Sequence, residues 1–456
     1  MDNLSRCELH AHIGGCLFTE DLVALFHQAC GDIDWSLFTL SYAQAFGENP
    51  PDPSLLLAAA DNTAALDQLR QLYIFTEADG PDFGRFMARF SLAIALIQHF
   101  RHSEGNDQTP VRRAFESQRE QGIKYVELRA MYMHGCGDPE GFLDFHRQNA
   151  TLATELSDST FRVRYVPSLS RKQPLQDYRL IRGIIGTNPS LREAIVGVDL
   201  CNVEEGYPPR TTVGLFRQLE VDNEADPANT LEVLYHVGEI YFDKSVESAV
   251  RWCHQAALLG APRLGHCTAL GLDPEAAIAR RTGECHAFES VAERCDQIRY
   301  DLLHSQNLQN HGVTVDEPRL RAELEELRGR HISDRVEHHY DAERLQEIRA
   351  RQDYVLEELT ILGTVIESCP TSNRRLGNVP TDNLHPVHRF LRSEVNLVIG
   401  ADDPGIFDSP LAEEVDWVAR TSELAPDQLA RRLGDPYRFR LGQFGARERR
   451  IQGDPT

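Results

Sequence analysis

Eight short, apolar, β-prone runs recur along this chain of 456 residues, with helical patterns between them, and this repetition constrains the fold most. The runs cover residues 7–13, 124–132, 162–169, 194–201, 232–239, 261–270, 364–373 and 396–404. Several are apolar on both faces, which is typical of strands covered on both sides. Strands that alternate with helices form βαβ units and a parallel sheet. Eight such units predict an α/β fold of the (β/α)8 TIM-barrel type, and a doubly wound sheet is the less favoured alternative.

Two intervals between these runs are too long for a single helix. Over a hundred residues separate the first two runs, with helical patterns at 17–30, 54–73, 82–101 and 110–122. About ninety residues separate the sixth and seventh runs, and 20 of the 42 residues in 317–358 are charged. We therefore predict helical insertions after strand one and between strands six and seven.

The second insertion, at about 275–360, is expected to be a set of solvated helices on the outside of the barrel, with His338 and His339 on a helix. A partner surface, such as a homo-oligomer interface, is the alternative. The domain prediction is one barrel over residues 1–425, including this insertion, and a C-terminal segment of surface helix and frayed tail over 426–456.

Composition excludes several functional classes. The formal net charge of −23 disfavours binding to nucleic-acid backbones and to anionic membranes. No apolar run approaches the roughly 20 residues that span a bilayer, and no signal peptide is visible. The ten cysteines form no CxxC pair, which favours reduced thiols in a cytoplasmic protein. The nucleotide-binding patterns GxGxxG and GxxxxGK[ST] are absent.

Candidate metal ligands and proton carriers follow the predicted strands, where barrels of this type carry their working residues. They are His10, His12, His236, Glu239, His266, Asp402 and Asp403. Singly, each has an ordinary explanation: packing for the HxH pair, a satisfied core histidine in "YHVGE", and a turn at "DDP". Together, three histidines and one aspartate form a plausible zinc shell with an open position for water.

The number of metal ions can also be argued from the sequence. Barrel hydrolases with an HxH motif often hold two metals bridged by a modified lysine on strand four. Here strand four ends in "VGVDLCN", and none of the three lysines lies there. We therefore predict one Zn²⁺, although the ligand types do not exclude iron or manganese.

Seven stretches that contain these residues resemble the adenosine deaminase family of metal-dependent amidohydrolases. They are "ELHAHIGG", "KYVELR", "IVGVDL", "HVGE", "RLGH", "SCPTSN" and "ADDP", and they occur in the family's order between residue 7 and about residue 415. The resemblance implies a zinc-dependent deaminase that attacks the amino-bearing ring carbon of an adenine-type purine with a metal-activated hydroxide and releases ammonia.

The resemblance also implies a role for each residue. Zinc would be held by His10, His12, His236 and Asp402. Glu239 would protonate the purine ring nitrogen and shuttle the water proton, and His266 would orient the hydroxide. Asp403 would hydrogen-bond the purine's imidazole edge. The substrate would also meet His12, Gly14 and Asn202.

The chain departs from the adenosine-specific pattern at three places. Gly14 replaces an aspartate that reaches the sugar hydroxyl, Asn202 replaces a glycine that meets the purine edge, and the interval before strand seven is unusually long. Loss of the acidic group at Gly14 leads to the hypothesis of a substrate with a larger or anionic 5′ substituent.

Two other functions remain open from the sequence: hydrolysis of a different ring or amide, and a lapsed barrel that works as a binding module. Among neighbouring residues, Asp199 is expected to orient a ligand histidine, since such imidazoles usually donate their other N–H. Cys369 is expected to be a buried thiol, Asn373 to shape its loop, and Arg374 and Arg375 to be solvated at the surface.

Overall fold

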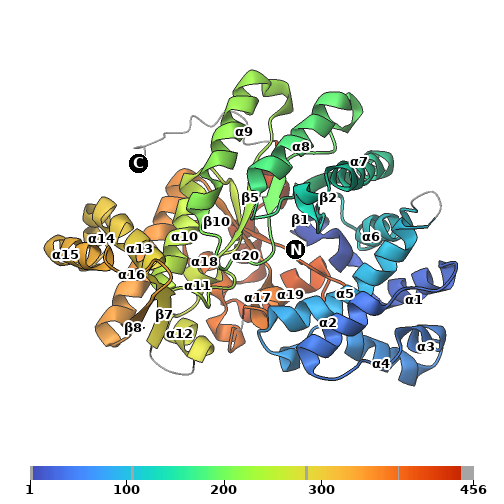
Figure 1. Ribbon diagram of the computed structural model, residues 1–456, viewed down its shortest axis with the longest axis horizontal. Coiled ribbons are helices and arrows are strands. Elements are labelled where there is room, and N and C mark those ends of the chain that lie inside the picture. The colour runs from blue at the N-terminus through green and yellow to red at the C-terminus, as the bar shows by residue number, and fades with distance from the viewer. Residues whose placement is uncertain (1–3, 104–106, 283–285, 378, 443–456) are drawn as a thin grey trace.

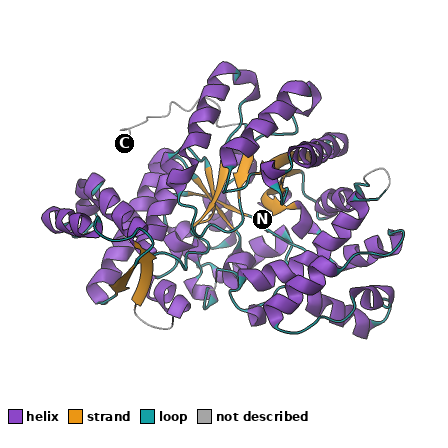
Figure 2. Cartoon of the chain, in the orientation of Figure 1, coloured by secondary structure: helices purple, strands orange, loops and turns teal. Residues whose placement is uncertain are grey.

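The eight predicted strands form one parallel sheet that curves into a barrel at the centre of the molecule (Figures 1 and 2). The computed structural model describes residues 4–103, 107–282, 286–377 and 379–442. Neighbouring strands lie in the order β1 (Cys7–His12), β2 (Tyr125–Met131), β3 (Arg162–Ser168), β4 (Val198–Leu200), β5 (Val233–Val237), β6 (Arg263–His266), β9 (Val365–Ser368) and β10 (Asn396–Ile399).

The barrel closes where β1 meets the residues that follow β10. Ala11 and Asp402 form a parallel bridge, and the amide of His12 donates to the carbonyl of Asp402 over 2.9 Å. The amide of Asp402 donates in turn to the carbonyl of His10 over 2.8 Å. The predicted (β/α)8 barrel is therefore confirmed. Each strand is shorter than its predicted run, because the end of the run turns into the loop that carries site residues.

The first insertion is a lobe of helices beside the barrel, on the lower right of Figure 1. Its helices are α1 (Thr19–Gln28), α2 (Ser36–Phe46), α3 (Pro53–Ala58), α4 (Thr63–Tyr73) and α5 (Phe83–Arg101). The sequence analysis missed α2, which buries only Phe38 and Tyr42 and exposes Leu40, so no apolar stripe marks it. The run at 54–73 is two helices, because Asn62 begins α4 by accepting from the amide of Ala64.

Helices between successive strands cover the outside of the barrel. They are α6 (Thr109–Glu120), α7 (Pro139–Leu156), α8 (Pro174–Thr187), α9 (Val213–Ala225), α10 (Val246–Leu258), α17 (Pro370–Arg375), α18 (Pro386–Arg392) and α19 (Leu411–Thr421). Among the described helices, none combines the length and the apolarity needed to cross a membrane.

The second insertion contains a β-hairpin as well as helices. Its elements are α11 (Thr268–Gly271), α12 (Pro274–Thr282), β7 (His286–Ser290), α13 (Val291–Leu303), α14 (Ser305–Asn310), α15 (Glu317–Leu327), β8 (Arg335–His339) and α16 (Ala342–Leu362). The antiparallel β7–β8 pair stands apart from the barrel (Figure 2). The prediction of a helix at His338 and His339 was wrong. His338 is buried and His339 exposed, so a two-residue period lay hidden in a highly charged segment.

The C-terminal residues of the described chain close the amino end of the barrel. After α20 (Pro426–Leu433), the side chain of Phe439 packs beside Cys7 and Tyr125, which begin their strands. The amide of Leu441 donates to Glu127 over 2.7 Å. The prediction of surface helix and fray was therefore wrong for 436–442, and residues 443–456 lie outside the described residues.

Candidate metal centre and active site

The four predicted metal ligands converge at the carboxyl end of the barrel. One ligand atom from each of His10, His12, His236 and Asp402 lies within 4.8 Å of all the others. Asp402 Oδ1 is 3.4 Å from His10 Nε2 and 3.3 Å from His12 Nε2. Nε2 of His10 and Nε2 of His236 are buried, and neither has a hydrogen-bond partner among the described residues. Unpaired imidazole nitrogens beside a carboxylate fit a divalent cation.

Backbone geometry at the site is strained. Asp402 has a φ of 61° and His266 a φ of 64°, in the left-handed region that residues other than glycine rarely adopt. Such conformations cost about 1–3 kcal/mol each and persist only where the surroundings impose them. At Asp402 the two hydrogen bonds to β1 impose the turn that directs its carboxylate towards His10 and His12.

Carboxylates behind the ligands orient the imidazole rings. His10 Nδ1 lies 2.7 Å from Glu367 Oε2, and His236 Nδ1 lies 3.0 Å from Asp199 Oδ1. Each carboxylate accepts from Nδ1, which leaves Nε2 free to face the cation. The predicted role of Asp199 therefore has the expected geometry. The sequence analysis missed Glu367, which interrupts the apolar run of β9.

Glu367 belongs to a fully buried network of charges inside the barrel. Arg129 Nη2 donates to Glu367 Oε2 over 2.6 Å, and Arg263 Nε lies 2.6 Å from its Oε1. Burial alone would raise the pKa of Glu367, but the charges of Arg129 and Arg263 and the contact with His10 hold it well below its ordinary value. The carboxylate is therefore ionised and keeps its hold on His10 at neutral pH.

Charge at the ligands favours a cation. Burial would raise the pKa of Asp402, but its close contacts with the imidazoles of His10 and His12 outweigh this effect and hold it well below its ordinary value. Burial lowers the pKa of His12, whereas the hydrogen bond with Asp402 and the charge of Asp403 raise it, to a net value of about 9. A metal ion bound at His12 would displace that proton.

The predicted proton carriers, Glu239 and His266, lie beside the ligands. Glu239 Oε2 is 3.6 Å from His266 Nε2, and Ser372 Oγ donates to Glu239 Oε1 over 3.5 Å. Burial raises the pKa of Glu239 above its ordinary value, although the charge of His266 opposes this effect. His266 Nδ1 lies 3.0 Å from Asn373 Oδ1, so Asn373 orients this ring from behind. The sequence analysis expected Asn373 only to shape its loop.

Glu204 fixes the backbone on both sides of Glu239. Its two carboxylate oxygens accept from the amides of Gly238 and Ile240, each over 2.8 Å. Gly238 has a φ of 69°, which suits a glycine at this turn. Burial raises the pKa of Glu204 to about 7. This residue was missed because it follows β4 within a loop and matches none of the motifs considered.

The Asp403 carboxyl group fills the space in which a side chain at residue 15 would lie, so this position requires a glycine. A Cβ added at Gly15 would overlap the Asp403 carboxyl group. Burial and the negative charge of Asp402 raise the pKa of Asp403 well above its ordinary value. Both effects favour the protonated form of the carboxyl group, which can donate a hydrogen bond.

Two of the three departures from the adenosine-specific pattern, Gly14 and Asn202, have different surroundings. Gly14 backs onto Phe90, and a Cβ there would lie 2.8 Å from Phe90 Cζ. The space that an acidic side chain would need is therefore taken by an aromatic ring. Asn202 has a φ of 66°, and its exposed side-chain Nδ2 lies 3.6 Å from Met131 Sδ.

The remaining residues singled out from the sequence are structural. Cys369 is a buried free thiol. Arg375 Nη1 donates to the carbonyls of Phe75 and Phe407 over 2.8 and 2.7 Å, and Arg374 lies 3.4 Å from Asp382. The expectation of simple surface solvation was therefore wrong for both arginines, which tie loops together.

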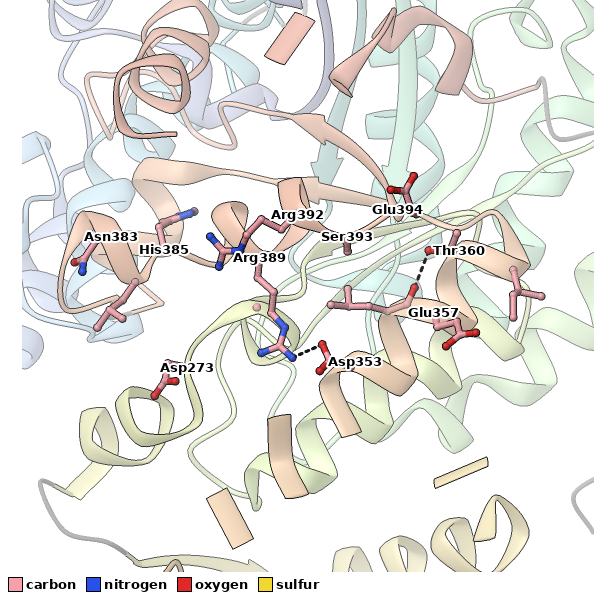
Figure 3. A pocket seen from close by; sticks show the side chains of 14 residues that line it. Asp273, Asp353, Glu357, Thr360, Asn383, His385, Arg389, Arg392, Ser393 and Glu394 are labelled. Carbon is pink, nitrogen blue, oxygen red and sulfur yellow. Dashed lines mark hydrogen bonds and ion pairs between the residues drawn. The ribbon is translucent and has the colours of Figure 1, made fainter. Parts of the chain in front are cut away.

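A groove of about 780 Å³ lies on the outer helices and contains none of the predicted site residues (Figure 3). Arg389 crosses it and contacts Asp353 over 2.6 Å. Arg389 and Asp353 therefore satisfy each other across the groove.

Comparison with known proteins finds similarity to deaminases over part of the chain. The family model described as adenosine deaminase matches residues 323–434. An adenine deaminase from Rhizobium leguminosarum bv. trifolii is 40% identical over 73 residues, which are 16% of this chain and 23% of that protein. An aminodeoxyfutalosine deaminase from Acidothermus cellulolyticus is 38% identical over 58 residues, 13% of this chain and 16% of that protein. The chain thus matches less than a quarter of the length of these curated relatives.

A solved structure with the same fold covers nearly the whole chain. It is the Arabidopsis N6-mAMP deaminase MAPDA, with a TM-score of 0.51 at 13% identity over 98% of this chain and 96% of that one. The family model and the curated relatives are therefore similar to part of this chain, and the solved structure shows that the chain shares its barrel fold.

Proposed function

We propose that the protein is a zinc-dependent hydrolase that removes the amino group of an adenine-type purine and releases ammonia. The observation that carries this proposal is the convergence of His10, His12, His236 and Asp402 within 4.8 Å, with the Glu239–His266 pair beside them. Three imidazoles and one carboxylate suit Zn²⁺, and one such set supports a single ion.

The metal would contribute the nucleophile. A divalent ion with an open coordination position lowers the pKa of a bound water to near 7, so that hydroxide is available at neutral pH. Glu367 and Asp199 would keep His10 and His236 in the tautomer that presents Nε2 to the ion.

Glu239 would move the protons of the reaction. Burial raises the pKa of its carboxyl group, which favours the protonated form that can donate to the ring nitrogen beside the attacked carbon. His266, held through Nδ1 by Asn373, would present Nε2 to the reacting water and to Glu239. Protonation of the ring lets the carbon accept the nucleophile, and the same carboxyl group can later return a proton to the leaving amine.

Asp403 and Phe90 would select the substrate. In its protonated form, which burial and the charge of Asp402 favour, the Asp403 carboxyl group donates a hydrogen bond and would match the acceptor nitrogen on a purine's five-membered ring. Phe90 stands behind Gly14, so this side of the site is aromatic where a carboxylate would contact a ribose hydroxyl. We infer that a free ribose is not the main recognition element, in accord with relatives described as adenine and aminodeoxyfutalosine deaminases.

A deamination panel tests this function. Ammonia release would be measured with adenine, adenosine, 5′-modified adenosines, adenine nucleotides and N6-methylated forms, before and after treatment with a chelator. We expect turnover of at least one purine, loss on metal removal and recovery with Zn²⁺. Activity that survives complete metal removal would contradict the metal mechanism. Adenosine turned over far better than every other compound would contradict the inference from Phe90.

A further inference from the structure

The second insertion contacts the helix that continues the Glu239 loop. Residues 238–245 join β5 to α10, and Ser245 begins α10 by accepting from the amide of Ser248 over 3.1 Å. Glu289, on hairpin strand β7, reaches this helix start from the insertion. Its Oε2 accepts from Ser248 Oγ over 2.7 Å, from Ser245 Oγ over 2.9 Å and from the Ser245 amide over 3.4 Å.

These contacts are buried and charged. Glu289 is 2% exposed, and Ser245 and Ser248 are 1% and 0% exposed. His338 Nε2, on the opposite hairpin strand, lies 2.6 Å from Glu289 Oε1. A carboxylate at a helix start also interacts favourably with the unpaired amides there. The hairpin thus places one negative charge where α10 needs an acceptor.

A second set of contacts holds the same turn of α10. Glu247 accepts from Arg344 Nε over 2.8 Å and from Tyr340 Oη over 3.0 Å, both beyond the hairpin. Arg344 Nη2 also donates to His338 Nδ1 over 3.0 Å, so the ring keeps its hydrogen on Nε2 for Glu289. The insertion therefore holds the first turn of α10 from two sides through one connected network.

The Glu239 loop is short and is fixed at both ends. Glu204 holds the amides of Gly238 and Ile240, and Asp243 accepts from the Gly206 amide over 2.8 Å. Only four residues separate Ile240 from Ser245, and Asp243 is one of them. Any movement at the start of α10 therefore reaches Glu239 through few rotatable bonds.

We propose that the hairpin insertion braces the loop that carries Glu239, with Glu289 as a positioning residue at the start of α10. The proposal rests on the function proposed above, in which Glu239 moves protons. A carboxyl group displaced by 1 Å can lose about 100-fold in rate, whereas substrate affinity depends on other groups. The brace should therefore act on kcat more than on KM.

Glu289→Gln tests the brace in the full-length, metal-loaded protein. The amide keeps the size of the side chain but loses the charge and replaces one acceptor with a donor. We expect kcat for the best substrate to fall roughly tenfold or more, with KM changed by less than about threefold. Hydrogen–deuterium exchange should become faster at the amides of residues 238–248.

Asp301→Asn is the matched control. Asp301 is 3% exposed and binds Arg351 with both oxygens, over 2.6 and 2.8 Å. This buried pair joins α13 to α16 within the insertion, and among the described hydrogen bonds it reaches α10 only indirectly, through Gln297, whose Nε2 donates to Asp301 over 2.8 Å. The control should lower the melting temperature while kcat and the exchange of residues 238–248 stay at wild-type values.

The following outcomes decide the proposal. A folded Glu289→Gln protein with wild-type kcat, or with unchanged exchange in residues 238–248, would overturn it. Equal losses of kcat in both variants would show general destabilisation and would also overturn it. If Glu289→Gln does not fold, Ser248→Ala is used instead, because it removes the hydrogen bond from Ser248 Oγ to Glu289. This variant must show a smaller fall in kcat and a smaller increase in the exchange of residues 238–248. A wild-type protein inactive on every purine would refute the proposed function instead, and the exchange comparison would still test the brace.

Discussion

Glu367→Gln is the substitution that most directly tests how the barrel interior supports the metal centre. Glu367 is fully buried and contacts three groups: His10 Nδ1 at 2.7 Å, Arg129 Nη2 at 2.6 Å and Arg263 Nε at 2.6 Å. Glutamine preserves the shape, but its NH₂ group must face one of these donors. The substitution therefore removes the charge shared by two buried guanidinium groups and weakens the orientation of His10.

The expected losses of stability and metal affinity follow from the ion pairs that remain after the substitution. Arg263 keeps Glu127 at 2.5 Å, whereas Arg129 keeps only Asp199 at 3.5 Å among the described carboxylates. Removing one partner of a buried ion pair costs about 3–5 kcal/mol of unfolding free energy, because a charge stays buried without compensation. Loss of the carboxylate behind a ligand histidine lowers metal affinity by about 10–100-fold.

Two measurements separate these effects. Denaturant unfolding with excess chelator gives the stability of the metal-free protein, and competition with a chelating dye gives the zinc affinity. Glu193→Gln is the control, because its pair with Arg164 is similar in length at 2.7 Å but the Glu193 side chain is 77% exposed. That pair should contribute at most about 1 kcal/mol. Wild-type stability together with wild-type zinc affinity in Glu367→Gln would refute the reasoning.

Three further predictions address the site and the insertion. Glu239→Gln should abolish ammonia release while melting temperature and zinc content stay unchanged; residual activity near wild type would remove Glu239 from the mechanism. Gly15→Ala should lower kcat/KM by about 100-fold at unchanged zinc content, because the new methyl group displaces Asp403; kinetics like wild type would show that Asp403 does not touch substrate. In Glu289 and Glu247, burial raises the pKa, but His338 and Arg344 respectively, with their neighbours, lower it to about 2, below the ordinary 4.5. Their stabilisation is thus complete above about pH 4.5 and is lost as the pH falls towards 2; the protection factors of the amides of residues 335–339, corrected for the intrinsic exchange rate at each pH, should fall across that window, and a loss of protection already complete at pH 6 would contradict it.

Much of the barrel could be predicted because its signal is local. Parallel strands covered on both faces appear as apolar runs, and eight runs with intervening helices leave few topologies. The ligand set could be predicted because parallel strands bring their carboxyl ends together, so His12, His236 and Asp402 meet although they are far apart in sequence. Because all eight strands end on the same side of the barrel, residues far apart in sequence are expected to lie close together there.

The parts that could not be predicted depend on partners elsewhere in the chain. The β7–β8 hairpin contains Glu289 and His338, which are buried because they bind each other and α10. A highly charged segment is normally exposed to solvent, so the sequence of this segment resembled that of an exposed helix. The closure of the barrel by residues 436–442 was hidden for the same reason, since Phe439 stands between arginines.

Charged residues within the barrel strands were a signal that the sequence analysis did not use. Glu127, Arg129, Arg263 and Glu367 each interrupt a run of apolar residues, and each is fully buried. An isolated charge in such a position would cost several kcal/mol, so a strand can carry one only if another strand supplies its partner. Two acidic and two basic residues distributed over β2, β6 and β9 satisfy that requirement. Glu367 Oε2 faces both Arg129 and His10, so the partner that the buried charge requires also orients a candidate metal ligand.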